Sequence, residues 1–230
     1  MYRNALFCGA FRRGCAAIPQ TGVGRMPKEN AIRLSPVEKQ GFFTNCERRG
    51  MDLLKECAQA YNKLLAYEYY FVIGRKGKSR EFALTFDKAD FHHLAGLHKL
   101  KDNMRLQRGK RADIFDEILE EKIGINQIQK SSFYKEMAMR LEPLTHLEEF
   151  LDNEQLIFRY NEKVHKYSCI KAEYLLEGKY KENVIYLFLG ARDDTLTHMC
   201  RTFFPKSDKN YSAGQPQFTL LKKEKLEKPY

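Results

Sequence analysis

The sequence predicts an α+β fold in which N-terminal helices pack on a curved, mainly antiparallel sheet of about four to five strands, with an additional N-terminal β-hairpin. Three observations lead to this prediction. Helical periodicity begins abruptly at residue 51, two β-rich runs with a glycine-containing loop follow at 67–86, and the last third of the chain contains repeated aromatic and β-branched runs. Short connections between these last runs leave no room for helical crossovers, so the strands should pair antiparallel.

The expected helices share apolar residues at spacings of three and four, and cover 51–66, a segment starting near Phe91, the region around 114–119, 125–130 and 131–152. Asp87 or Asp90 can cap the second of these helices, because an aspartate side chain accepts hydrogen bonds from the first free backbone amides. Pro143 should kink or divide the last one, since proline cannot donate the helical hydrogen bond.

The expected strands are rich in aromatic and β-branched residues, and cover 67–74, 80–86, 156–161, 166–176, 183–191, 197–205 and 215–223. Two glycines in the loop between the first two strands favour a hairpin there. Four basic residues lie at its tip: Arg75, Lys76, Lys78 and Arg80. They can contact phosphate, or they can simply keep the hairpin soluble.

Length and composition suit one domain. The chain has 230 residues, 43% of them hydrophobic and 13% aromatic, which is enough for a sizeable core. No apolar run reaches 18 residues, so we expect neither a membrane span nor a membrane partner. We place a single domain at 51–225 and a charged tail at 226–230. Residues 1–50 are basic and rich in Gly, Ala and Pro, and we expect them to be disordered or to be an extension upstream of a start at Met51.

Positive charge is concentrated in blocks. The net charge is +10, with +7 in residues 74–111 (eleven basic, four acidic), −5 in 112–170 (seven basic, twelve acidic) and +4 in 201–230 (seven basic, three acidic). Two basic blocks around an acidic helical segment favour an anionic partner on one face, and nucleic acid is the commonest such partner. A solvated surface without any partner explains the same distribution.

Cysteine spacing and missing motifs exclude several functional classes. The six cysteines form no CxxC pair and no Cys/His cluster with zinc spacing, so we expect reduced thiols, no bound metal and a cytoplasmic location. Walker, GxGxxG, GxSxG and kinase motifs are missing as well, which disfavours the commonest nucleotide-dependent enzymes and hydrolases. We therefore expect no cofactor.

The segment 91–100, FHHLAGLHKL, holds three of the six histidines of the chain. On a continuous helix, His92 and Lys99 would lie within about 20° of each other, beside Gly96, where a substrate backbone could approach closely. His93 would be half-buried, and its pKa could shift there. The competing interpretation is an ordinary amphipathic helix whose histidines cap or pack.

Metal-independent cleavage of RNA is a reaction that needs none of the missing motifs. The ribose 2′-OH attacks the neighbouring phosphate, and the protein supplies a base, an acid and cationic or hydroxyl donors. The end of the chain carries side chains of these types: Arg201 and Thr202, one on each face of a strand, then Tyr211, Thr219 and Lys222. An arginine can hold phosphate by a forked contact. Taken singly, each of these residues is also ordinary in a strand.

Several segments together resemble a known family: FHHLAGLHKLKD, SSFYKEM, LTHLEEFLDN, RYNEK, IYLFL, CRTFFP and YSAGQPQFTLLKK. Through them, residues 51–225 resemble the fourth subgroup of the phage-associated Barnase–EndoU–Colicin–RelE-like nucleases. The resemblance implies N-terminal helices, a twisted sheet of about four strands and metal-free endonuclease activity on RNA. The catalytic residues that it implies by position are His93, with His92 as its rival, Arg201, Thr202, Tyr211 and Thr219.

Two hypotheses follow. The first is a metal-independent endoribonuclease of toxin or effector type from a phage or mobile element, with RNA as substrate and an inhibitor or immunity protein as a further partner. In it, His93 or His92 is the acid–base group, and Lys99 and Arg201 stabilise phosphate charge. Further RNA contacts would come from Arg75, Lys76, Lys78, Arg80 and Lys222. The alternative is a non-catalytic nucleic-acid or partner-binding module of a mobile element, in which the basic residues at 75–80 matter more than His93.

Overall fold

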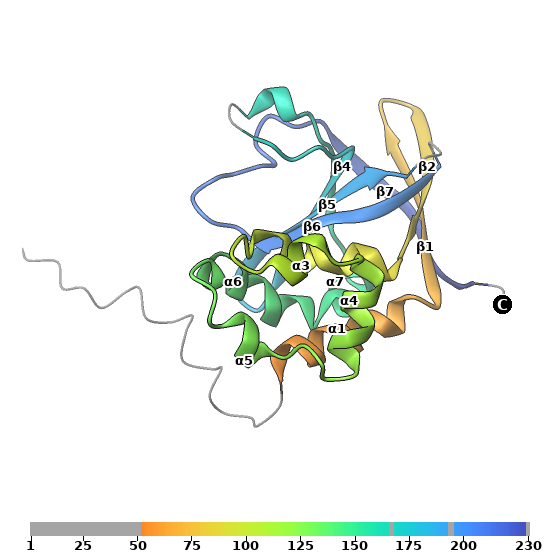
Figure 1. Cartoon of the computed structure of the whole chain (residues 1–230). Coiled ribbons are helices and arrows are strands. Elements are labelled where there is room, and N and C mark those ends of the chain that lie inside the picture. Colours follow the sequence, from red (N-terminus) through yellow and green to blue (C-terminus); the bar gives the residue numbers. More distant parts are fainter. Residues whose placement is uncertain (1–51, 166–167, 193–195, 229–230) are drawn as a thin grey trace, which may run out of the picture. The chain divides into compact units, whose positions relative to one another are not determined.

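The computed structural model describes residues 52–165, 168–192 and 196–228, so the predictions for 1–50 lie outside the described residues. The helices are α1 (Leu53–Leu64), α2 (Phe91–Leu94), α3 (Met104–Arg108), α4 (Arg111–Leu119), α5 (Ile125–Ile128), α6 (Tyr134–Leu144) and α7 (Leu147–Asp152), with short 3₁₀ helices η1 (Lys88–Asp90), η2 (Leu97–Lys99) and η3 (Glu162–Val164). The strands are β1 (Tyr67–Arg75), β2 (Lys78–Thr85), β3 (Leu156–Arg159), β4 (Tyr174–Tyr180), β5 (Asn183–Ala191), β6 (Thr197–Pro205) and β7 (Gln217–Glu227) (Figure 1).

The strands form a closed, mixed seven-stranded barrel in the order β1-β2-β6-β5-β4-β3-β7, with β1 and β7 paired to close it. The predicted curved sheet of four to five strands with an additional hairpin is therefore wrong. The hairpin itself is confirmed, and Lys76 and Gly77 adopt the positive φ angles that a two-residue hairpin turn requires. However, β1 pairs with β7 and β2 pairs with β6, so the hairpin belongs to the barrel wall.

The sequence pattern could not predict that the sheet closes into a barrel. Alternation of apolar and polar residues specifies which face of a strand is buried, but it does not specify which distant strand lies beside it. The strands that close the barrel come from opposite ends of the described chain, with all the helices except α1 between them. The last strand also runs to Glu227, two residues past the domain end expected at 225.

Capping explains where several helices begin. The Asp52 side chain accepts hydrogen bonds from the backbone amides of the first turn of α1. Asp87 and Asp90 form a capping box, in which each side chain accepts from a backbone amide at the other end of η1. Pro143 lies in the last turn of α6, and the predicted long helix divides there into α6 and α7.

The histidine-rich segment is not a continuous helix. The helix α2 ends at Leu94, and Gly96 takes a left-handed conformation with φ of 78° before η2 begins. The predicted shared helical face of His92 and Lys99 is therefore wrong. A side chain at Gly96 would lie 3.0 Å from Cδ of Arg140 and 3.1 Å from Cβ of Met137, so the close approach occurs between this turn and α6.

Two apolar clusters hold the molecule together. The main core joins the helices to the inner face of the barrel, through residues such as Tyr61 of α1 and Phe82 of β2. On the opposite face of the sheet lies a second cluster, which we call the outer aromatic cluster: Phe158, Tyr160, Leu175, Tyr186 and Phe188, with Phe204 and Tyr211 packed against it. Because β5 is buried on both faces, its sequence is an almost continuous apolar run.

Helices α2 and α6 pack against β6, as Figure 1 shows. The hairpin of β1 and β2 extends away from these helices in the same view. No helix within the described ranges is long and apolar enough to cross a membrane.

The junction between β2 and β6 is one of the two shortest in the barrel, because only two residues of each strand pair there, in parallel, as only two do between β3 and β7. Arg192 strengthens it. Its guanidinium donates to the side-chain oxygen of Thr85 (2.8 Å), to the backbone oxygen of Thr85 (3.2 Å) and to a carboxylate oxygen of Asp90 (2.6 Å). Asp90 is only 8% exposed, so without Arg192 it would be a buried carboxylate with no cation beside it.

We expect Arg192→Ala to lower the free energy of unfolding by about 2 kcal/mol, because it removes several charge-assisted hydrogen bonds and leaves Asp90 unpaired. Urea denaturation measures the difference. The matched control is Lys88→Ala, which removes an exposed ion pair with Asp116 (2.8 Å) and should cost less than about 0.5 kcal/mol. Equal losses in the two variants would contradict the proposed role of Arg192 in closing the barrel.

Candidate active site

Three imidazole rings lie together where α2, which packs against β6, meets η2. The ring centroids of His93 and His98 are 4.8 Å apart, and the ring of His92 lies 5.9 Å from that of His93 and 6.4 Å from that of His98. The left-handed turn at Gly96 separates α2 from η2 and redirects the chain between the first two histidines and the third. The rings therefore meet through the turn that breaks the predicted helix.

His92 is held by the backbone. Its side chain is 4% exposed, and its Nε2 atom lies 2.8 Å from the backbone oxygen of Leu106. A carbonyl oxygen can only accept, so Nε2 carries the proton in this contact. The other nitrogen, Nδ1, is buried and has no hydrogen-bond partner among the described residues, and burial lowers the pKa of His92. These contacts favour a positioning role for this ring.

His93 is half-buried and surrounded by cations. Burial is the largest cause that lowers its pKa, to about 4, and the positive charges of Arg111, His92, Arg201 and Arg140 lower it further. The pKa of His98 is also lowered to about 4, first by burial and then by His93 and Arg140. Both imidazoles are therefore unprotonated at neutral pH, when no anion is bound.

Arg140 is a site residue that the sequence prediction missed. It lies on α6 beside Met137 and Leu141, which face the main core, and it is itself only 8% exposed. Its Nη1 atom donates to the hydroxyl of Thr202 (2.7 Å), and its guanidinium lies 5.2 Å from the ring centroid of Phe204. Burial lowers its pKa to about 10. The available signal was a charged residue on the apolar face of an amphipathic helix.

A β-bulge presents Arg201 and Thr202 together. The register between β5 and β6 shifts at this point, and Arg201 is the extra residue of β6. Cys200 and Phe203, on either side, are both buried in the main core, so Arg201 and Thr202 both lie outside it. The prediction of one side chain on each face is therefore wrong. Gly190 leaves room for Arg201, because a Cβ atom there would lie 2.7 Å from Cγ of the arginine.

Tyr211 and Lys99 complete the group of predicted residues at this place. The Tyr211 ring lies 5.8 Å from that of Phe204 in the outer aromatic cluster, and the guanidinium of Arg140 lies 5.2 Å from the same Phe204 ring. The Lys99 side chain is half-buried, its Nζ atom is 3.9 Å from a carboxylate oxygen of Glu136, and burial followed by Arg140 lowers its pKa. The structure thus brings His92, His93, Lys99, Arg201, Thr202 and Tyr211 into one region.

Thr219 and Lys222 are not part of this region. Both lie on β7, which is separated from β6 by two strands in one direction around the barrel and by three in the other. The two strands are therefore on opposite sides of the barrel. Thr219 is exposed and pairs with Gly74 of the hairpin.

The basic hairpin tip is also distant from the histidines. Arg75, Lys76, Lys78 and Arg80 are all exposed. The pairing of Ala83 with Thr197 places Lys78 five residues to one side of the junction and Arg201 four residues to the other, because β2 and β6 run parallel. At strand spacing this is roughly 30 Å along the strands. The tip is a separate basic surface.

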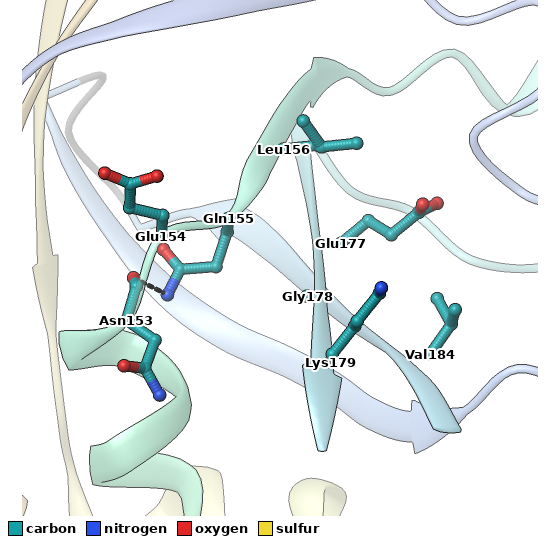
Figure 2. Close-up of a pocket in the computed structure, with 8 residues that line it drawn as sticks. All are labelled: Asn153, Glu154, Gln155, Leu156, Glu177, Gly178, Lys179 and Val184. Carbon is teal, nitrogen blue, oxygen red and sulfur yellow. Dashed lines mark hydrogen bonds between the residues drawn. The ribbon is translucent and has the colours of Figure 1, made fainter. Parts of the chain in front are cut away.

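A hollow elsewhere on the barrel carries none of the predicted residues (Figure 2). Its lining comes from the end of α7, β3, β4 and β5: Asn153, Glu154, Gln155, Leu156, Glu177, Gly178, Lys179 and Val184. Two glutamates and one lysine give this lining a negative balance, which disfavours a phosphate ligand. Within the described ranges, no group of three or more His, Cys, Asp or Glu side chains could hold a metal ion.

Imidazoles and guanidiniums gathered at one place are typical of proteins that act on phosphodiesters. Comparison with known families agrees with that class. Residues 53–229 match the family described as phage-Barnase-EndoU-ColicinE5/D-RelE like nuclease4, and the chain belongs to this family. The resemblance found in the sequence is therefore confirmed. No curated protein and no solved structure matches the chain.

We expect the protein to lose stability as the pH falls from about 6.5 to about 4. In that interval the folded state binds fewer protons than the unfolded state, because the folded pKa values of His93 and His98 lie near 4, below their usual 6.5. Stability therefore rises with pH across the interval. A variant with His93→Gln and His98→Gln should show a shallower change of thermal midpoint with pH than the wild type.

The matched control for this measurement is His146→Gln, since His146 is an exposed histidine beside Glu149 and outside the site. It should reproduce the wild-type pH profile. Parallel profiles for the wild type and the double variant would contradict the depressed pKa values.

Proposed function

We propose that this chain is a metal-independent endoribonuclease of a phage or mobile element, of the toxin or effector type, acting on RNA in the cytoplasm. The observation that supports this most is the half-buried imidazole of His93 beside the guanidiniums of Arg140 and Arg201. Membership of a phage nuclease-like family supports action on nucleic acid. The reaction assigned to the site uses only side chains that lie in it.

In the proposed reaction, the unprotonated imidazole of His93 takes the proton of the ribose 2′-OH. The 2′-oxygen forms a bond to the adjacent phosphorus while the bond from phosphorus to the 5′-oxygen breaks, and the leaving 5′-oxygen takes the proton that the imidazolium of His93 then releases. The products are a 2′,3′-cyclic phosphate and a 5′-hydroxyl. The lowered pKa keeps this base unprotonated at neutral pH, and a bound phosphate would raise the pKa toward the operating pH, where a general base is most efficient.

The remaining residues act on the charge of the phosphate. Arg201 lies at the bulge and is exposed, so it can reach a bound phosphate, and Lys99 lies close enough to Arg140 to add a second cation. Thr202 and Tyr211 supply hydroxyl groups on the same side of β6. Developing negative charge is stabilised by donors already in place before the reaction. Thr219, across the barrel, receives no role.

We expect the purified protein to cleave RNA in the presence of EDTA, and His93→Ala to lower the rate by about 10²–10⁴-fold, the contribution typical of a general base. Cleavage is followed on gels, with 2′,3′-cyclic phosphate ends as the diagnostic product and circular dichroism as the test of folding. The control is His146→Ala, which should cleave like the wild type. Cleavage that requires a divalent metal, or that survives in His93→Ala, would contradict the proposal.

The second candidate function is a non-catalytic nucleic-acid or partner-binding module of a mobile element. The basic hairpin tip favours it, because this surface lies far from the histidines and can bind phosphates without any reaction. A host-growth assay separates the two functions. Toxicity that disappears with His93→Ala supports the ribonuclease, and a toxin of this type would also require an inhibitor or immunity protein in its own host.

We expect charge reversal of Arg75, Lys76 and Lys78 to glutamate to weaken RNA binding without changing the rate of cleavage at saturating RNA. Each lost phosphate contact should reduce the slope of log affinity against log salt by about 0.7 for single-stranded RNA. Fluorescence anisotropy over a salt series measures the slope. If the reversals abolish cleavage at saturating RNA while His93→Ala does not, the binding surface has been assigned wrongly.

A further inference from the structure

Arg140 is a buried arginine, and no carboxylate of the described residues lies beside its charge. Among the described residues it forms no ion pair. Its Nε atom is buried and has no hydrogen-bond partner in the described part of the chain, and its Nη1 atom donates to the neutral hydroxyl of Thr202. By contrast, Arg192 is paired with Asp90, and Arg159 is paired with Glu173.

An enclosed charge of this kind is costly in free energy. Moving a charged group out of water is unfavourable unless another charge or a full set of hydrogen bonds offsets it. Lys99 makes the imbalance larger because it is a second cation near Arg140, and the unprotonated His98 offsets neither charge. Glu136 is the nearby acid, and it lies 3.9 Å from Lys99. An anionic ligand would supply the charge that the site lacks.

The Arg140 side chain is also held in place before any ligand arrives. The missing side chain of Gly96 leaves the space that its Cδ atom occupies, where a Cβ would be only 3.0 Å away. Phe204 lies beneath the guanidinium, with its ring centroid at 5.2 Å, and Thr202 accepts from Nη1. A guanidinium fixed on three sides loses little conformational entropy when it binds an oxyanion.

We propose that Arg140 is a catalytic residue that binds the phosphate group at the reacting phosphorus of the RNA, with Thr202 and Phe204 as the positioning residues that aim it. This inference rests on the proposed ribonuclease function and adds a residue to its site. Arg201 and Lys99 are more exposed and approach the same phosphate from the rim. We call this phosphate-binding place the anion site. Arg140 lies at its centre, where its guanidinium stabilises the negative charge that develops on the phosphorane.

The test uses the whole protein, with inorganic phosphate as probe and Arg140→Met as the variant. Methionine fills a similar volume without a charge, so this variant should unfold at the same temperature as the wild type, or higher, in phosphate-free buffer. Phosphate at ten times its dissociation constant should raise the wild-type thermal midpoint by about 2–5 °C and leave the variant unchanged. A purely structural Arg140 would instead make Arg140→Met less stable in both buffers.

Two further measurements complete the test. Arg140→Met should cleave RNA about 10²–10³-fold more slowly than the wild type. Arg140→Lys keeps the positive charge but loses the forked pair of guanidinium donors. Phosphate should therefore raise its thermal midpoint by part of the wild-type amount. The matched control is Arg105→Met, which removes an exposed ion pair with Glu117 (2.7 Å) and should change neither the phosphate shift nor cleavage.

The outcomes distinguish this inference from the function on which it rests. A wild-type protein that shows no phosphate shift, or a shift that is equal in Arg140→Met, overturns the anion site. Wild-type cleavage that persists in Arg140→Met overturns the catalytic role of Arg140 and leaves the ribonuclease standing. If phosphate raises the thermal midpoint of the wild type but not of Arg140→Met, and the wild type cleaves no RNA, then the anion site stands and the ribonuclease function is overturned.

Discussion

Uncompensated positive charge at β6 is the constraint on which the rest of the site depends. Arg140 and Arg201 both act on the imidazole of His93, and Arg140 forms no ion pair among the described residues. Like charges gathered in a partly buried place repel strongly, because water no longer screens them. Burial first, and then these cations, lower the pKa values of His93 and His98, and the positive charge makes an anion the favourable ligand. Both consequences come from the same few contacts.

Local departures from regular structure create this arrangement. The bulge in β6 puts Arg201 and Thr202 outside the core together, where regular alternation would separate them. The left-handed Gly96 ends the helical run and makes room for Arg140 of α6. The closed barrel fixes β6 between its neighbours, so the bulge presents its side chains from a rigid wall. The bulge in β6 and the left-handed turn at Gly96 therefore both lie at the proposed active site.

The sequence predicted those features that depend on residues close together in the chain. Helical and strand periodicity located most of the elements, and the hairpin and the division near Pro143 are both present. Closure of the barrel could not be predicted, because it depends on pairing between strands far apart in the chain. The expected continuous helix through the histidines is wrong for a local reason, because Gly96 adopts a positive φ and interrupts it.

Part of the candidate site could likewise be predicted from the sequence. His93 and Arg201 were identified by residue type and by resemblance, and they do lie close enough to interact. Thr219 was grouped with them because it is near Arg201 in the sequence, although the barrel places it on the far side. Arg140 was missed because it lies in a segment of net negative charge, where a single arginine looks like a surface residue. Its place on the apolar face of the helix was the one available signal, and its burial on α6 distinguishes it in the structure.

The most direct test of the central claim is an NMR titration of the His93 imidazole, with and without an oligonucleotide that lacks the 2′-OH at the cleavage site and so binds without reacting. The account predicts a pKa near 4 in the free protein, caused by burial and the surrounding cations. It predicts a rise of more than about one unit when the phosphate of the bound oligonucleotide offsets those cations. A pKa near 6.5 in the free protein, or a value that the bound oligonucleotide does not change, would contradict it.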